Sequence, residues 1–231
     1  MMAMFDTHET FKDRRDAGRR LAETLTHLKG ERPVVLALPR GGVPVAFEVA
    51  KALSAPLDLL MVRKLGAPGY PEYGVGAVVD GADPQVVLNE EAMQVVDPPR
   101  GYVEAEMERQ LAEIERRRRT YLAGRQPVPL AGRTAIVVDD GIATGGTVRV
   151  ALKALRRSAA ARLVLAVPVA PRDSLALLQA DADEVVCLDA PSNFRAVGFH
   201  YENFDQTSDA EVVQLLDAAR AWPIRSESSG Q

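Results

Sequence analysis

The fold of this chain is decided by residues 135–147, which read AIVVDDGIATGGT. The apolar run that begins this segment has the length and composition of a buried strand. Asp139 and Asp140 end the strand, and a glycine-rich loop then opens a helix. Glycines let backbone N–H groups approach an anion, and Thr144 and Thr147 add hydroxyl donors beside the positive end of the helix. The segment therefore predicts a phosphate-binding loop at the carboxyl end of a strand.

The same loop favours a sugar phosphate over other phosphate ligands. It lacks the Gly-Lys-Ser/Thr ending of a P-loop and the Gly-x-Gly-x-x-Gly spacing of dinucleotide folds. Two adjacent carboxylates, Asp139 and Asp140, suit vicinal sugar hydroxyls because carboxylates accept hydrogen bonds from them. An acidic helix cap followed by a glycine turn is the purely structural alternative.

Length and composition indicate a soluble chain with one main core. The 231 residues suffice for one α/β domain with an accessory flap. A formal net charge of −4 gives no case for nucleic acid, so we expect a small-molecule partner. Neither a signal-peptide pattern nor a run of roughly 18 apolar residues is present, so we expect no membrane and a cytoplasmic location. Cys187 is the only cysteine, which excludes an intrachain disulfide.

Strands and helices alternate along the chain. Apolar runs predict strands at residues 33–38, 57–62, 134–138, 163–169 and 184–188. Helical periodicity predicts helices at residues 11–30, 43–53, 101–122, 148–155 and 173–179. Repeated strand–helix units with continuously apolar strands indicate an α/β fold whose parallel sheet has helices on both faces.

A flexible flap is expected between the second strand and the long helix. Residues 66–74 are rich in glycine and proline, which favours an exposed loop over a packed element. Apolar flanks around residues 80–84 predict a β-hairpin. We therefore expect a flap and hairpin over about residues 65–100 of a single domain spanning 1–231, with a disordered tail at 226–231.

The basic run Arg116–Arg119 lies within the predicted long helix. An anion-binding patch is one interpretation of this run. Acids that precede it can pair with it at i to i+4 spacing, so a solvated helix face is the interpretation we favour.

Residues 137–147 resemble the signature of the type I phosphoribosyltransferase family, in which apolar residues, two acids and a short spacer precede Thr-Gly-Gly-Thr. The resemblance implies that Asp139 and Asp140 hold the ribose hydroxyls of 5-phosphoribosyl-1-pyrophosphate (PRPP). It implies that the 5-phosphate is bound by Ala143, Thr144, Gly145, Gly146 and Thr147. It further implies a small C-terminal hood over about residues 188–205.

Two more segments are similar to family motifs that bind pyrophosphate. The loop containing Arg40, Gly41 and Gly42 follows the first core strand, where the family has a backbone N–H and a basic side chain that meet the leaving group. Arg63 and Lys64 resemble the flap that closes over pyrophosphate. A simple strand-to-helix turn and two basic residues at a strand end are the respective structural alternatives.

The resemblance implies Mg²⁺ as cofactor and a mechanism without a covalent protein nucleophile. Its catalytic residues would be Asp139, Asp140, Arg40 and Lys64. Mg²⁺ with Arg40 and Lys64 would stabilise the departing pyrophosphate while the carboxylates hold the ribose. Asp139, Asp140 and Glu202 are the candidate metal ligands, either directly or through water.

The acceptor is not identified by these motifs. Residues 191–199 are similar to the base-binding hood of hypoxanthine-type members, which makes Phe194 and Val197 candidate acceptor contacts, with ordinary packing as the alternative. However, Ala143 stands where those enzymes place an acid, and Ala170 near where they place a lysine.

We therefore expect a transferase that joins the ribose phosphate to a nitrogenous base, with a non-catalytic PRPP sensor as the alternative. A hydrolase or kinase of the same fold class has no nucleophile elbow or Walker lysine to support it. By analogy with the family, the long helix and the flap offer a surface for a homodimer.

Overall fold

The computed structural model describes residues 10–80 and 84–222. The tip of the predicted hairpin, residues 81–83, and the predicted tail lie outside the described residues. Within them, no helix combines the length and the apolar composition needed to cross a membrane.

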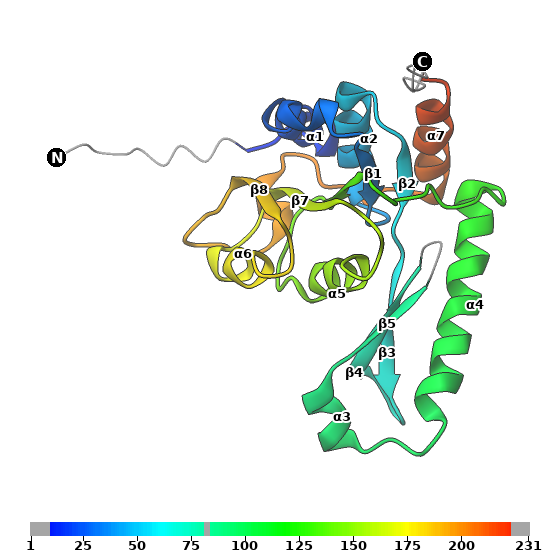
Figure 1. Ribbon diagram of the computed structural model, residues 1–231. Helices are drawn as coiled ribbons and strands as arrows, with labels where there is room; N and C mark the ends of the chain where they lie inside the picture. Colours follow the sequence, from blue (N-terminus) through cyan, green and yellow to red (C-terminus); the bar gives the residue numbers. More distant parts are fainter. Residues whose placement is uncertain (1–9, 81–83, 223–231) are drawn as a thin grey trace.

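A parallel sheet of five strands forms the core, in the order β2-β1-β6-β7-β8 (Figure 1). Its strands are β1 (Val34–Ala37), β2 (Leu57–Leu59), β6 (Thr134–Val138), β7 (Arg162–Val169) and β8 (Glu184–Asp189). One face carries α1 (Arg14–Thr24) and α2 (Gly42–Leu53), with α7 (Asp209–Arg220) packed beside α2. The other carries α5 (Gly146–Leu155) and α6 (Arg172–Leu178). This architecture confirms the predicted α/β fold.

The sheet is buried on both faces because alternate residues of each strand point to opposite sides. Val35 and Ile136 pack with the apolar sides of α1 and α2. Leu36 and Val137 pack with α5 and α6. All four are at most 4% exposed. This explains why the strands read as continuous apolar runs without polar alternation.

A second sheet and two helices form an arm that projects from the core (Figure 1). The arm consists of the antiparallel strands β3 (Val62–Ala67), β4 (Tyr70–Val79) and β5 (Gln85–Leu88) with helices α3 (Glu90–Val96) and α4 (Tyr102–Leu122). The pairing of β4 with β5 confirms the hairpin expected around residues 80–84. Two short 3₁₀ helices, Thr26–Gly30 and Val197–His200, complete the described elements.

The predicted exposed loop over residues 66–74 is wrong, because this stretch forms the β3–β4 hairpin. Gly69 takes the left-handed conformation in its turn, with φ of 76°. A Cβ atom on Gly66 would lie 2.7 Å from the backbone of Pro71, so glycine there allows the two strands to approach closely. The glycines that suggested a loop thus serve a tight hairpin.

The strand predicted over residues 57–62 is split between the two sheets. β2 ends at Leu59 in the core sheet, and β3 begins at Val62 in the arm. Arg63 and Lys64 therefore lie in the arm sheet, not at the carboxyl edge of the core sheet. The helices α3 and α7 were not predicted from the sequence.

The arginines of the basic run in α4 differ in how far they are buried. Arg116 and Arg117 donate to Glu113, and Arg119 donates to Glu115, which agrees with a solvated helix face. Hydrogen bonds from Arg116 and then Arg117 lower the pKa of Glu113 to about 2. Arg118 alone turns inward and is 8% exposed.

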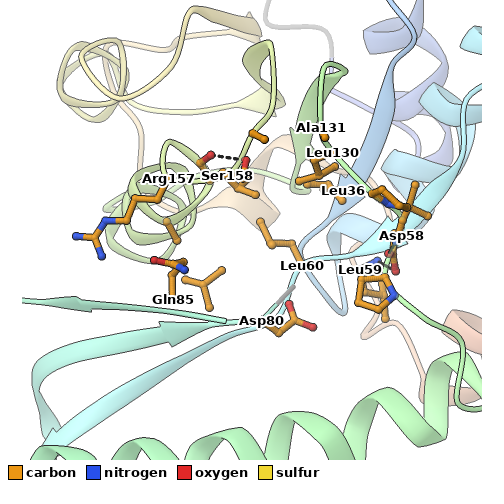
Figure 2. A pocket seen from close by; sticks show the side chains of 17 residues that line it. Leu36, Asp58, Leu59, Leu60, Asp80, Gln85, Leu130, Ala131, Arg157 and Ser158 are labelled. Atoms are coloured by element: carbon orange, nitrogen blue, oxygen red, sulfur yellow. Dashed lines mark hydrogen bonds between the residues drawn. The ribbon is translucent and has the colours of Figure 1, made fainter. Parts of the chain in front are cut away.

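Arg118 joins the arm to the core through two buried carboxylates. Its guanidinium lies 2.5 Å from Asp80 at the end of β4 and 3.6 Å from Asp58 of β2. Asp80 also accepts a hydrogen bond from Met61 N at 2.6 Å, and Asp58 accepts one from Val128 N at 2.8 Å. Figure 2 shows Asp58 and Asp80 at the border of a largely apolar cavity of about 300 Å³ at this junction.

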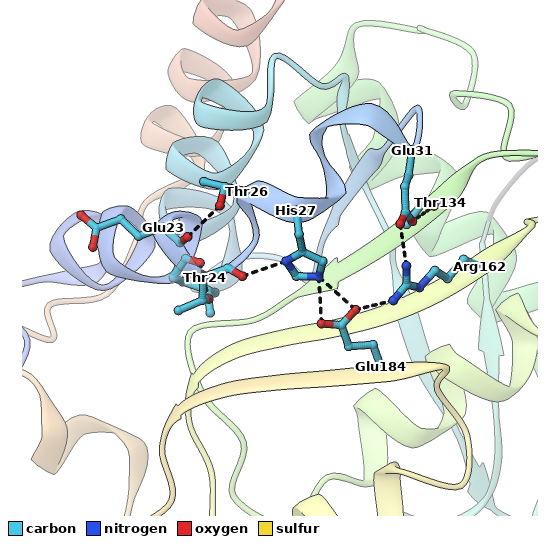
Figure 3. Close-up of polar contacts among 9 residues, drawn as sticks. Glu23, Thr24, Thr26, His27, Glu31, Thr134, Arg162 and Glu184 are labelled. Atoms are coloured by element: carbon cyan, nitrogen blue, oxygen red, sulfur yellow. Dashed lines mark hydrogen bonds and ion pairs between the residues drawn. The ribbon is translucent and has the colours of Figure 1, made fainter.

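The amino ends of the core strands are held by a separate polar network (Figure 3). Arg162 bridges Glu31 at 2.6 Å and Glu184 at 2.7 Å. His27 contacts the same Glu184 carboxylate at 3.1 Å. These contacts tie the 3₁₀ turn after α1 to β7 and β8, and they lie at the edge opposite to the carboxyl ends of the strands.

We expect Arg118→Leu to lower the free energy of unfolding by about 3–5 kcal/mol, because it leaves Asp58 and Asp80 buried without their cation. Arg119→Leu is the matched control on the same helix. Its side chain is 74% exposed, so its loss should cost about 0.5 kcal/mol or less. Urea unfolding of both variants measures the difference. Equal effects would show that the buried ion pairs do not hold the arm in place.

Candidate functional site

The loops that follow β1 and β6 meet at the carboxyl edge of the core sheet. The two strands are paired in parallel, with Ala37 opposite Val138. Beyond this pair, Leu38 N donates to Val138 O at 2.9 Å. The Arg40 loop (residues 38–42) and the glycine loop (residues 141–146) therefore begin at neighbouring points. Ligands of open parallel sheets bind at this edge.

The glycines of the Arg40 loop lie directly against the acidic pair. A Cβ atom on Gly42 would lie 3.0 Å from Asp139 Cα and 2.8 Å from Val138 O. A Cβ atom on Gly41 would collide with the carboxylate of Asp140. Both positions thus require glycine for close approach of the Arg40 loop to the acidic pair. The peptide bond between Pro39 and Arg40 is cis.

The acidic pair is only partly compensated by nearby positive charge. Desolvation, together with the charge of Asp140, raises the pKa of Asp139 well above its ordinary value. Asp139 accepts a hydrogen bond from Asp140 N at 2.9 Å. Asp140 accepts one from Arg14 Nε at 2.7 Å, and its backbone oxygen accepts one from the Tyr201 hydroxyl at 2.5 Å. Such a pair is suited to cations and to hydroxyl donors.

The glycine loop leads into the N-terminus of α5. Gly145 is the N-cap residue and has φ of 76°, a conformation that favours glycine. The base of the loop is fixed by Ile142 N, which donates to Val169 O, and by Ser174 Oγ, which donates to Ala143 O, both at 2.9 Å. The residues predicted to bind phosphate are exposed or partly exposed at this helix terminus: Ala143, Thr144, Gly145, Gly146 and Thr147. The first turn of α5 therefore presents backbone N–H groups to an anion.

The two glycines at the start of α5, the N-cap Gly145 and the first helical residue Gly146, differ in why glycine is needed. A Cβ atom on Gly146 would meet no atom within 4 Å. A Cβ atom on Gly145 would lie 3.3 Å from Leu178 Cδ1, on the side of the protein interior. Gly145 is thus needed mainly for its left-handed backbone.

Arg40 extends from its loop toward α4 and α7. Its Nη1 lies 3.3 Å from Asp209 Oδ1, which also accepts a hydrogen bond from the Tyr121 hydroxyl at 2.8 Å. These three residues and Arg116 and Arg117 border a cavity of about 280 Å³. The guanidinium of Arg40 therefore lies beside a basic cavity next to the Arg40 loop.

Arg63 and Lys64, the other basic residues predicted to bind pyrophosphate, belong to the arm. Arg63 Nε donates to Gln110 Oε1 of α4 at 3.0 Å. The stem of Lys64 packs against Gly74, where a Cβ atom would lie 3.2 Å from Lys64 Cγ. Both residues thus make contacts within the arm, and the structure does not place them in the two loops of the core.

The predicted hood makes contacts within itself and with the glycine loop. The ring of Phe194 stacks on His200, with centroids 5.7 Å apart and an interplanar angle of 12°. Val197 packs against Gly141, where a Cβ atom would lie 2.5 Å from Val197 Cγ1. Phe199 is 72% exposed. The predicted acceptor contacts therefore lie next to the site but already have neighbours.

Glu202 does not join the acidic pair in a metal cluster. It is exposed, and its backbone N donates to Phe11 O at 2.8 Å. Across residues 10–80 and 84–222, no three His, Cys, Asp or Glu side chains form a group that could hold a metal ion.

Arg14 and Tyr201 contact the acidic pair, and the sequence predicted neither of these contacts. Arg14 lies 126 positions from Asp140, and Tyr201 lies 61 positions from it. Arg14 is one of several arginines in a polar helix, and Tyr201 lies within the predicted hood, outside the motif at residues 191–199. Neither carries a local pattern that indicates a site.

Residues 8–203 match the sequence profile of the phosphoribosyl transferase domain. Two curated relatives of Mycobacterium tuberculosis, "Putative phosphoribosyl transferase Rv0571c" (strain ATCC 25618 / H37Rv) and "Putative phosphoribosyl transferase MT0597" (strain CDC 1551 / Oshkosh), are 52% identical over 209 residues. The match covers 90% of this chain and 47% of each relative, so the chain spans about half the length of the curated relatives it matches.

Among solved structures, TT1426 from Thermus thermophilus is 43% identical to the chain, with a TM-score of 0.78. The match covers 90% of this chain and 97% of TT1426. The similarity therefore extends over the core and the arm together.

We expect Asp139→Asn to stabilise the protein at neutral pH in buffer containing EDTA. Desolvation and the charge of Asp140 raise the folded-state pKa of Asp139 above its unfolded value of about 3.9, so ionisation of Asp139 favours the unfolded chain. As the pH rises from about 4 through the raised pKa, the wild type should become less stable, because the unfolded chain releases the Asp139 proton more readily than the folded chain. The variant lacks this carboxyl and should not show this loss. Thermal midpoints between pH 4 and 8 measure the growing difference.

Asp183→Asn is a control for which we expect the opposite change in stability. Desolvation raises the pKa of Asp183, but hydrogen bonds from Leu163 N and Arg156 lower it more, so the net pKa is lowered. This variant should therefore become less stable than the wild type as the pH rises to about 4 from below, so its thermal midpoints are measured down to about pH 2. The same trend in both variants would contradict the electrostatics assigned to Asp139.

Proposed function

The chain belongs to the phosphoribosyl transferase family, and we propose that it transfers the phosphoribosyl group of PRPP to a nitrogenous acceptor and releases pyrophosphate. The observation that carries this proposal is the position of Asp139 and Asp140. They follow β6, directly against the glycines of the Arg40 loop and just before the glycine loop that leads into α5. A phosphoribosyl ligand needs acceptors for its sugar hydroxyls. On either side of these acceptors it needs hydrogen-bond donors for its phosphates.

In the proposed complex, each part of PRPP meets a different element. The 5-phosphate binds backbone N–H groups at the start of α5 and the hydroxyls of Thr144 and Thr147. The ribose hydroxyls donate to Asp139 and Asp140. The pyrophosphate lies along the Arg40 loop, which Gly41 and Gly42 allow to pack closely against the acidic pair.

Mg²⁺ fits the chemistry of this donor set. The ion prefers oxygen ligands and usually binds through one or two carboxylates together with substrate phosphates. Asp139 and Asp140 supply carboxylates whose combined charge is only partly offset by Arg14. When bound, Mg²⁺ would stabilise negative charge on the departing pyrophosphate. We place Glu202 outside this donor set.

The transfer exchanges one bond at the anomeric carbon for another. The C–O bond to pyrophosphate breaks, and its electron pair leaves with pyrophosphate. A lone pair of the acceptor nitrogen forms the new C–N bond, and that nitrogen then loses its proton to solvent. The acidic pair and the glycine loop hold the ribose phosphate in place for this attack.

Arg40 and Lys64 are the proposed cations for the leaving group. Arg40 lies in the loop itself and would exchange its contact with Asp209 for the pyrophosphate. Lys64 lies in β3 of the arm, where its stem packs against Gly74. Phe194 and Val197 remain the proposed acceptor contacts, and Ala143 and Ala170 argue against a 6-oxopurine acceptor.

We expect the wild type to bind PRPP more tightly with Mg²⁺ than without it, because the pyrophosphate concentrates negative charge. Asp139→Asn combined with Asp140→Asn should weaken this binding by roughly two to four powers of ten, since each charge-assisted hydrogen bond contributes about 1.5–3 kcal/mol. Isothermal titration calorimetry measures both effects. Near-normal binding by the folded double variant would remove the pair from the site.

Turnover is tested separately by pyrophosphate release with a panel of nitrogenous bases. Release with any base supports the transferase. Tight Mg²⁺–PRPP binding without release across the panel would instead favour a PRPP sensor.

We expect Gly145→Val to abolish binding of the 5-phosphate, because a β-branched residue disfavours φ of 76° and displaces the start of α5. Gly132→Val is the matched control, since Gly132 has φ of 65° and a Cβ there would meet no atom within 4 Å. Both variants should lose about 1–3 kcal/mol of stability to backbone strain. Thermal shifts with ribose 5-phosphate should then be lost only in Gly145→Val, and equal shifts would place the phosphate elsewhere.

A further inference from the structure

We propose that Arg14 is a positioning residue of the ribose site, which holds one oxygen of Asp140 so that its other oxygen accepts a sugar hydroxyl. Arg14 is the first residue of α1, remote in sequence from the motifs at the ends of the core strands. This inference rests on the proposed function. It adds a residue that the family motifs quoted above do not contain.

The guanidinium of Arg14 is fixed by three separate contacts. Its Nε donates to Asp140 Oδ2 at 2.7 Å, and its Nη1 donates to the backbone oxygen of Asp205 at 2.6 Å. Its plane lies over the ring of Phe204, with Cζ 3.8 Å from the centroid. The side chain is only 11% exposed. An exposed surface ion pair would lack this enclosure.

Asp140 is correspondingly held in one orientation. Its Oδ2, the atom that accepts from Arg14, is also the atom that a Cβ on Gly41 would strike. Its backbone oxygen accepts from the Tyr201 hydroxyl at 2.5 Å. The carboxylate therefore lies between Arg14 and the Arg40 loop, and rotation is limited on both sides. A fixed acceptor discriminates between sugars better than a mobile one.

The positive charge of Arg14 also supports Asp140 as an acceptor for the sugar. Two adjacent carboxylates repel each other, and partial burial strengthens that repulsion. A guanidinium bound to Oδ2 of Asp140 offsets part of this charge. Arg14 thereby keeps Asp140 available as an acceptor beside Asp139.

Competition between Arg14 and the sugar would predict the opposite change in affinity. If Arg14 instead occupied the place of the sugar in the free protein, the ligand would have to displace it. Its removal would then tighten binding. The sign of the change in affinity therefore distinguishes positioning from competition.

The experiment compares Arg14→Gln with Arg15→Gln in the full chain. Arg15 is a matched control, because its Nε also contacts a carboxylate oxygen, Glu48 Oε1, at 2.7 Å and its guanidinium also lies over a ring, that of Phe47. Dissociation constants are measured by calorimetry for two probes, ribose 5-phosphate and inorganic phosphate. Both probes use the glycine loop, but only the first has sugar hydroxyls.

Arg14→Gln should raise the dissociation constant for ribose 5-phosphate roughly tenfold or more, and that for inorganic phosphate by less than about twofold. Arg14→Lys should recover part of the loss, since it keeps a cation beside Asp140. Arg15→Gln should change neither constant. The ratio of the two constants is unaffected by a general loss of folded protein.

Three results with Arg14→Gln would overturn the inference. Unchanged binding of ribose 5-phosphate by Arg14→Gln would show that Arg14 does not act on the sugar, and tighter binding would show that it competes with the sugar. An equal loss for both probes would show a disrupted loop and no positioning of Asp140. If the wild type itself binds neither ribose 5-phosphate nor Mg²⁺–PRPP, the proposed function fails and this inference fails with it.

Discussion

The parallel pairing of β1 with β6 is the constraint on which the candidate site depends. The hydrogen bond from Leu38 N to Val138 O extends this pairing to the last residue of β6. The Arg40 loop is thereby brought so close to Asp139 and Asp140 that Gly41 and Gly42 leave no room for a Cβ atom. A shift in register would separate the proposed pyrophosphate and ribose contacts, because each comes from a different strand.

The acidic pair has an unfavourable environment that a bound ligand would relieve. Desolvation and mutual repulsion raise the pKa of Asp139, and Arg14 offsets only part of the charge. Groups that are costly in the free protein concentrate at functional sites, since selection for binding maintains them. The neighbouring contacts of Arg14, Tyr201 and Gly41 then explain how Asp140 keeps one orientation despite this cost.

The arm is joined to the core by charge as well as by apolar packing. Arg118 bridges Asp58 of the core sheet and Asp80 of the arm, and both acids also accept backbone hydrogen bonds. Because Arg63 and Lys64 lie in the arm, this junction sets how near they come to the Arg40 loop. The proposed leaving-group cations thus depend on two elements, the loop for Arg40 and the arm for Lys64.

The sequence by itself determined the local chemistry. The continuously apolar strands predicted a sheet covered on both faces, and the segment 135–147 predicted an acidic pair before a glycine loop, because both patterns are set by neighbours in the chain. Only the tertiary structure decided which distant residues meet this pair. Arg14 reaches Asp140 through the packing of α1, and Arg63 and Lys64 depart from the core because β3 pairs with β4. Such contacts join residues far apart in sequence, where spacing and periodicity carry no information.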